Sequence, residues 1–268
     1  MKTKLNGEVK NMFLKNAVRL APLFVAILLV TWGKSTASGP AKSAMPSQTQ
    51  AAGTQSSSGE IAGKVAFEGV KPKLATIKMD QDPVCMELHN DPVIVEDGAV
   101  NENGTLPNVF VYVKQGAEKY SSPVPTKTVI LDQHGCMYQP HVLGVMAGQE
   151  LLIVSSDPTT HNIHPMPKNN REWNQSQPPG AVPLEKKFAH PEIMIPVKCN
   201  QHPWMKAYIG VTANPFYSVT GSDGTFNIKG LPPGDYIIEA WTATFGSEEQ
   251  KVTVRPNESI NVNFSFSR

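Results

Sequence analysis

Apolar residues recur at every second position in several short runs of this chain. Residues 109–113 carry valine at alternate positions, and residues 262–266 alternate valine and phenylalanine with polar residues. A period of two is typical of half-buried β-strands. Turns separate the runs, and glycine and proline number 20 and 23 among the 268 residues. An all-β fold is therefore predicted.

The N-terminal 37 residues follow a different pattern. Basic residues between positions 2 and 19 precede an apolar run over 20–32 and small residues at Ser35 and Ala37. The run is shorter than the roughly 20 apolar residues that a membrane-spanning helix needs. Residues 1–37 are therefore interpreted as a signal peptide, which predicts a periplasmic or extracellular protein. An uncleaved N-terminal anchor is the alternative, and only through such an anchor would we expect the protein to be attached to a membrane.

The net charge of the chain is informative only when residues 1–37 are counted separately. The whole chain has a net charge of +1, but six of its 24 basic residues and one of its 23 acidic residues lie in this stretch. The remainder has a net charge of −4, and it offers no basic patch for a nucleic acid. Residues 38–59 lack aromatic and branched aliphatic side chains, so they predict a flexible linker.

The most specific chemistry lies between Val197 and Met205, where Cys199, His202 and Met205 fall within seven residues. A thiolate, an imidazole and a thioether are softer ligands than zinc usually takes. Two histidines and a cysteine with a weak axial methionine are the pattern of a type 1 (blue) copper site. A buried structural thiol is the alternative for Cys199. The copper interpretation requires a second histidine from elsewhere in the chain.

Two upstream histidines are candidates for that position. His161 and His164 follow an apolar strand and a loop that contains Asp157. Alternation along a strand places His164 on the face opposite His161. Since a strand end can meet a loop at the same pole of a sandwich, His161 is the predicted ligand and His164 the alternative.

The order of these features resembles the cupredoxin family. Tyr138-x-Pro140, an apolar strand over 148–155 and the pair His161-Asn162 precede the cysteine motif, as in plastocyanin-like and amicyanin-like cupredoxins. The resemblance implies that residues 128–215 form a cupredoxin-like Greek-key sandwich, in which Asn162 ties the two ligand loops together. It implies one type 1 copper held by His161, Cys199, His202 and Met205.

The same resemblance implies that His202 lies near the surface and passes the electron to a redox partner protein. Pro203 and Trp204 beside it could then form an apolar docking patch, although packing between two sandwiches is an equal alternative for Trp204. Multicopper oxidases and copper nitrite reductases need a histidine next to the copper cysteine. Here the neighbours are Lys198 and Asn200, so an electron carrier is expected rather than an enzyme.

A second resemblance covers the sequence on either side of this insert. The motif from Asp223 to Ile238, Asp-Gly-x-Phe-x-Ile-x-x-Leu-Pro-Pro-Gly-x-Tyr-x-Ile, resembles the carboxypeptidase-regulatory-like (transthyretin-like) β-sandwich domain. Ile61-x-Gly-x-Val65 matches the opening strand of that family. The resemblance implies one sandwich built from residues 60–127 and 216–268 and interrupted by the cupredoxin-like insert.

Cys85 and Cys136 remain once the copper cysteine is assigned. An exported protein can form disulfides, so a bridge between them is predicted. A second metal site is the alternative, because His89, His134 and His141 lie at ligand-like spacing from these cysteines.

The leading functional prediction is a one-electron carrier that meets redox partner proteins outside the cytoplasm. Two other classes use the same sequence features. A copper sequestration or delivery protein needs the same ligands without a reversible redox cycle. A structural or adhesive β module would use the metal for stability alone.

Overall fold

The computed structural model describes residues 57–268. The predicted signal peptide and almost all of the predicted linker therefore lie outside the described residues. The described part contains 17 strands and one helix of five residues, which confirms the predicted all-β fold. Over this range, no helix has the length and apolar character needed to cross a membrane.

Strands from both ends of the described chain form a first sandwich. One sheet has the order β13-β1-β16, with β17 also paired to β1, and the other has the order β12-β2-β14-β15. The strands are β1 (Gly59–Glu68), β2 (Phe110–Gln115), β12 (Tyr217–Val219), β13 (Thr225–Leu231), β14 (Gly234–Thr242), β15 (Gly246–Val254), β16 (Ser259–Asn261) and β17 (Phe264–Ser267). Their inward side chains share one hydrophobic core.

The opening motif of this sandwich has a steric reason for its glycine. A Cβ atom on Gly63 would lie 1.7 Å from the carbonyl oxygen of Val262, so only glycine lets the two backbones approach here. Ile61 and Val65 on either side are fully buried. The relationship of this sandwich to the transthyretin-like family stays a prediction, as do the exact domain boundaries.

The middle of the chain forms a second sandwich with its own core. One sheet has the order β4-β3-β6-β9, and the other has the order β5-β11-β10-β7-β8. The strands are β3 (Val129–His134), β4 (Met137–Gln139), β5 (Val142–Met146), β6 (Leu151–Ser155), β7 (His161–Pro165), β8 (Gln175–Gln177), β9 (Leu184–Lys186), β10 (Glu192–Lys198) and β11 (Lys206–Thr212). The pairing of β7 with β10 and of β10 with β11 brings together the strands that carry the predicted ligands.

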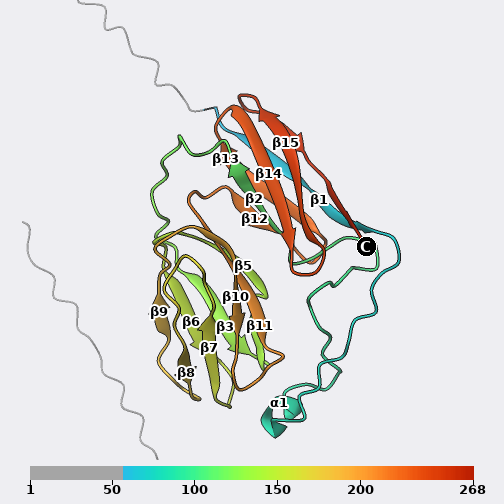
Figure 1. The fold of residues 1–268 in the computed structure, drawn as a ribbon, viewed down its shortest axis with the longest axis vertical. Coiled ribbons are helices and arrows are strands. Elements are labelled where there is room, and N and C mark those ends of the chain that lie inside the picture. The colour runs from blue at the N-terminus through green and yellow to red at the C-terminus, as the bar shows by residue number, and fades with distance from the viewer. Residues whose placement is uncertain (1–56) are drawn as a thin grey trace, which may run out of the picture. The chain divides into compact units, whose positions relative to one another are not determined.

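A long segment, residues 69–109, connects β1 to β2 and carries the helix α1 (Pro83–Glu87). Figure 1 shows this blue-green segment running away from β1 to α1 and back to β2. Asp82 caps the helix by accepting a hydrogen bond from the backbone N–H of Val84 at 2.9 Å, and Pro83 occupies the first turn. Both residues favour a helix start. A disulfide joins Cys85 of this helix to Cys136 between β3 and β4, so the segment is bonded to the second sandwich.

Candidate metal centre

Three strand ends place the four predicted ligands at one pole of the second sandwich. His161 is the first residue of β7, Cys199 follows β10 directly, and Met205 immediately precedes β11. The connecting loop is closed by a hydrogen bond from the Met205 N–H to the His202 carbonyl oxygen at 2.9 Å. The exposed fractions are 0% for His161 and Met205, 2% for Cys199 and 3% for His202. The fold therefore buries all four side chains together.

The side chains of His161, Cys199 and His202 turn their donor atoms toward one another. One ring nitrogen of each histidine and Sγ of the cysteine lie within 4.8 Å of one another. The Nδ1 atoms of His161 and His202 are 2.9 Å apart, and Sγ of Cys199 is 3.8 Å from Nδ1 of His202. Such an N₂S set suits copper. Met205 is fully buried in the same core cluster as Cys199.

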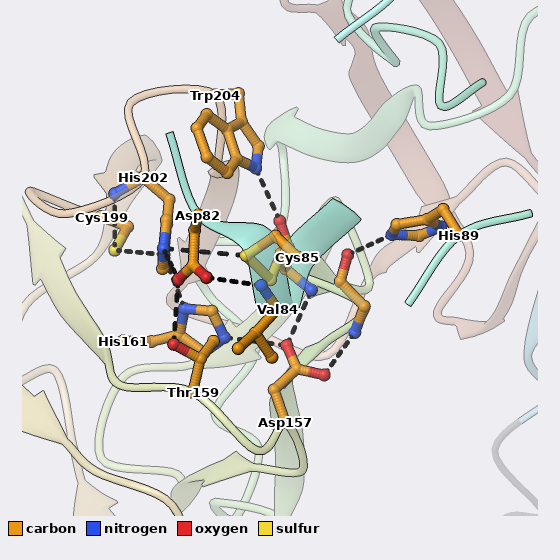
Figure 2. Close-up of a disulfide and its surroundings, with 12 residues drawn as sticks. Asp82, Val84, Cys85, His89, Asp157, Thr159, His161, Cys199, His202 and Trp204 are labelled. Carbon is orange, nitrogen blue, oxygen red and sulfur yellow. Dashed lines mark hydrogen bonds and ion pairs between the residues drawn. A yellow bond between two sulfur atoms is a disulfide. The ribbon is translucent and has the colours of Figure 1, made fainter. Parts of the chain in front are cut away.

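A carboxylate holds the far side of each ring. Nε2 of His161 lies 2.8 Å from Oδ2 of Asp157, and Nε2 of His202 lies 2.9 Å from Oδ2 of Asp82 (Figure 2). A hydrogen on each Nε2 satisfies these contacts, and this tautomer leaves the Nδ1 lone pairs free. Two lone pairs facing each other at 2.9 Å are unfavourable unless a proton or a metal cation lies between them.

The electrostatics of the site favour a charged histidine beside a thiolate. Burial acts to lower the pKa of His161, but the hydrogen bond to Asp157 and the interaction with Cys199 outweigh it and raise the pKa to about 9. Burial acts to raise the pKa of Cys199, but hydrogen bonds from His161 and from backbone N–H groups outweigh it and lower the pKa. A thiolate is the form that binds metals.

Asn162 connects the two ligand loops as the cupredoxin resemblance implies. Its Oδ1 accepts a hydrogen bond from the backbone N–H of Asn200 at 2.7 Å and lies 3.3 Å from Sγ of Cys199. The hydroxyl of Tyr138 adds a second tie, since it donates to the carbonyl oxygens of Asn162 and Lys198. These contacts fix the spacing between β7 and the cysteine.

His164, the alternative upstream ligand, lies outside this group. Its Nε2 contacts Glu172 at 2.5 Å, and its Nδ1 lies 3.3 Å from Oδ1 of Asn200. The structure therefore brings His161 to Cys199 and leaves His164 on the other face of β7.

The roles of both carboxylates were not predicted from the sequence. Asp157 precedes His161 by four residues and also accepts hydrogen bonds from the N–H groups of Gly135 and Cys136, each at 2.7 Å. The Asx-containing loop before His161 was the available signal. Asp82 comes from the segment 69–109 and also accepts a hydrogen bond from the Thr159 hydroxyl at 2.9 Å. The position of Asp82 three residues before Cys85 was the available sequence signal.

The expectation that His202 lies near the surface is wrong. The segment 69–109 covers its Nε2 edge with Asp82, and Sγ of Cys85 lies 3.7 Å from the same nitrogen. The neighbouring Trp204 is half-buried and donates from Nε1 to the carbonyl oxygen of Cys136 at 3.0 Å. Trp204 therefore packs against the disulfide cluster, while Pro203 is exposed.

The disulfide also uses both cysteines of the alternative second metal site. Cys85 and Cys136 are bonded, with their Cα atoms 5.6 Å apart. Nearby histidines have other partners. His89 Nε2 contacts the Gly135 carbonyl oxygen at 2.7 Å, and His141 Nε2 contacts Asp97 at 2.8 Å.

No protein-family model and no curated protein matches the chain. Solved structures that are similar to part of it include a nitrite reductase, a purple cupredoxin and an amicyanin mutant. The copper-containing nitrite reductase of Thermus scotoductus is 19% identical over 37% of this chain and 25% of its own, with a TM-score of 0.30. The purple cupredoxin of Nitrosopumilus maritimus is 18% identical over 31% of this chain and 99% of its own, with a TM-score of 0.27.

The third is a single-residue mutant of amicyanin in its Cu(I) form. It is 15% identical over 38% of this chain and 98% of its own, with a TM-score of 0.28. This chain thus spans about a quarter of the nitrite reductase chain and nearly all of the two small cupredoxins. The assignment of the site therefore depends on its own geometry.

Proposed function

We propose that this protein is a type 1 copper protein that carries single electrons outside the cytoplasm. The observation that carries the proposal is the orientation of the two histidines. Both Nε2 atoms are held by carboxylates, and both Nδ1 atoms face each other and the Cys199 thiol.

The donor set fits copper better than zinc. His161, His202 and Cys199 supply two imidazoles and a thiolate, and Met205 is the fourth candidate ligand within the same buried cluster. Zinc would favour a carboxylate or a second thiolate in place of a thioether. The two carboxylates near the site already contact the Nε2 atoms, on the opposite side of each ring from Nδ1.

Burial of the ligands supports electron transfer rather than catalysis. Copper would supply a one-electron redox couple. The four ligand residues are at most 3% exposed, whereas a catalytic metal site keeps an open position for water or substrate. Hydrogen bonds through Asn162, Asp157 and Asp82 hold the side chains in one arrangement, which limits structural change when the charge of the site changes.

The proposed location outside the cytoplasm rests on the predicted signal peptide and on the disulfide. Cys85 and Cys136 are bonded in this fold. Disulfides persist in oxidising compartments and are rare in the cytosol. Redox partner proteins in such a compartment are the proposed donors and acceptors.

Absorption and voltammetry of the copper-loaded protein test the proposal. We expect an intense visible band from the thiolate-to-copper transition and a reversible one-electron wave. His161→Ala should abolish the band, and the matched variant His164→Ala should retain it. A colourless complex that binds copper tightly would instead support sequestration or delivery. Copper that only raises the unfolding free energy, with neither the band nor the redox wave, would support the structural alternative.

A further inference from the structure

The segment 69–109 closes the approach to the metal centre over His202. The contacts that hold it there include the bond between Cys85 and Cys136, the contact of Asp82 with His202, and the contact of His89 with the Gly135 carbonyl oxygen. Figure 2 shows the first turn of α1 placed directly against the His202 ring. A partner cannot reach the edge of this ring while segment 69–109, called the cover below, is in place.

A groove of about 570 Å³ leaves a different approach open beside Cys199. The floor of the groove is the outward face of the β10–β11 hairpin, where Pro196 pairs with Tyr208 and Lys198 pairs with Lys206. Among residues 57–268, all residues that line the groove lie between positions 166 and 208. Segment 69–109 therefore contributes no lining residue. Besides the hairpin residues and Cys199, the lining residues include Met166, Asn200 and Pro203.

The groove is positively charged, although residues 38–268 together have a net charge of −4. Lys198 and Lys206 lie directly opposite each other on neighbouring strands, and like charges in this arrangement destabilise a sheet. No acidic residue lines the groove among the residues that the structure describes. Asp97 does not line the groove; Lys206 interacts with its charge, but His141 at 2.8 Å and the Tyr208 hydroxyl at 3.2 Å share the same carboxylate. A negative partner would relieve the repulsion between the two lysines.

The groove reaches one of the predicted ligands directly. Cys199 itself lines it, and Lys198 is the preceding residue of the chain. The apolar residues Met166, Pro203 and Tyr208 line the same groove as the two lysines. Transient protein interfaces likewise combine apolar and polar or charged residues.

We propose that this groove is the electron-exchange surface and that it receives the acidic face of a redox partner protein. The inference rests on the proposed type 1 copper function and adds the side from which the electron enters. It replaces the expected route through His202, whose Nε2 edge is occupied by Asp82.

Oxidation of the Cu(I) protein by two small complexes tests the route. Hexacyanoferrate(III) is an anionic oxidant, and tris(phenanthroline)cobalt(III) is a cationic one. The double variant Lys198→Glu/Lys206→Glu should lower the ratio of the anionic to the cationic rate constant by about tenfold or more at low ionic strength, and salt should reduce the difference. The ratio cancels any change in redox potential, because both reagents react with the same copper.

The matched control is Lys229→Glu/Lys251→Glu, which makes the same change of net charge at exposed positions of the first sandwich. Its ratio should stay within about twofold of that of the wild type, because the reversed charges lie outside the groove. Equal changes in both double variants would show a general charge effect and overturn the proposal.

Poly-L-glutamate is the probe for an acidic protein surface. It should slow the reaction of the wild type and of the control variant with hexacyanoferrate(III), which the polyanion does not bind, and it should leave the slower reaction of the groove variant unaffected. Inhibition of all three proteins to the same extent would overturn the acidic partner. Absence of the visible copper band before any kinetic measurement would instead refute the proposed function, so the two failures are distinguishable.

Discussion

The two histidines predicted as ligands are oriented in the same way by carboxylates of different origin. His161 receives Asp157 from its own loop, four residues earlier in the chain. His202 receives Asp82 from the segment between β1 and β2, at a sequence separation of 120 residues. One half of the metal centre is therefore local to the second sandwich, and the other half is completed by a connection of the first sandwich. The first sandwich thus contributes directly to the site.

The disulfide joins these two halves. Asp157 accepts hydrogen bonds from the N–H groups of Gly135 and Cys136, and Cys136 is bonded to Cys85 three residues after Asp82. Replacement of Asp157 can therefore be compared with the matched replacement of Asp82. The comparison predicts a larger effect for the buried local carboxylate than for the partly exposed one on the cover.

Replacement of Asp157 by alanine should have the largest effect. The residue is 4% exposed, and its carboxylate binds His161 and two backbone N–H groups. Buried donors that lose their acceptor cost roughly 1–3 kcal/mol each, so we expect the unfolding free energy of the copper-free protein to fall by about 3–5 kcal/mol. Denaturant unfolding followed by tryptophan fluorescence measures this change.

The variant Asp157→Asn is the control for that experiment. It keeps one acceptor oxygen for the backbone N–H groups, so its loss should be clearly smaller. If the alanine variant lost less than about 1 kcal/mol, the hydrogen bonds of Asp157 would not hold the turn that carries Cys136.

Removal of the disulfide should have the next largest effect. The double variant Cys85→Ser/Cys136→Ser opens a link between residues 51 apart in sequence. Such links stabilise proteins by about 2–4 kcal/mol, mainly through the unfolded state. Amide hydrogen exchange should also become faster in residues 77–95 than in β7, because the cover loses its covalent attachment. Unchanged exchange in the cover would show that noncovalent contacts alone hold it.

The local half of the site could be predicted from sequence because its contacts follow from alternation and short spacing. The period of two places Cys199 with Ile195 and Val197 on the buried face of β10. The same period separates His161 from His164. The predicted all-β fold also depends on this pattern, which each strand carries within its own residues.

The cover could not be predicted in the same way. The bond between Cys85 and Cys136 was expected from the cysteine count, but its position against His202 depends on how segment 69–109 folds across the second sandwich. The cupredoxin resemblance covers the insert alone, and it implied that His202 lies near the surface because the covering residues lie outside the insert. A contact over 120 residues leaves no periodic signal in the sequence.

Replacement of Asp82 by alanine should have a smaller effect than loss of Asp157. The Asp82 side chain is 18% exposed, and it caps α1 while contacting His202. Loss of an N-cap and of one hydrogen bond costs about 1–2 kcal/mol. NMR of the imidazole rings should show a change at His202 and little change at His161. Equal changes at both rings would contradict separate support of the two histidines.

The smallest effect on stability is expected from the charge of His141. This residue of the second sandwich contacts Asp97 near the end of the cover. Burial acts to lower the pKa of His141, but the hydrogen bond to Asp97, the charges of Glu96 and Asp97 and the contact with the Lys206 carbonyl outweigh it and raise the pKa. The protonated ring can donate to Asp97 and to the Lys206 carbonyl oxygen at the same time. The raised pKa means that the folded state holds this proton more tightly than the unfolded state does.

Stability from this proton is therefore fully present below the ordinary histidine value of about 6.5 and declines as pH rises through the raised folded value. Unfolding free energies of the copper-free protein, measured at intervals from about pH 6 upward, should fall for the wild type. The variant His141→Asn should be less stable at the acidic end and should show a shallower dependence. Parallel curves for the two proteins would assign the pH dependence to other groups.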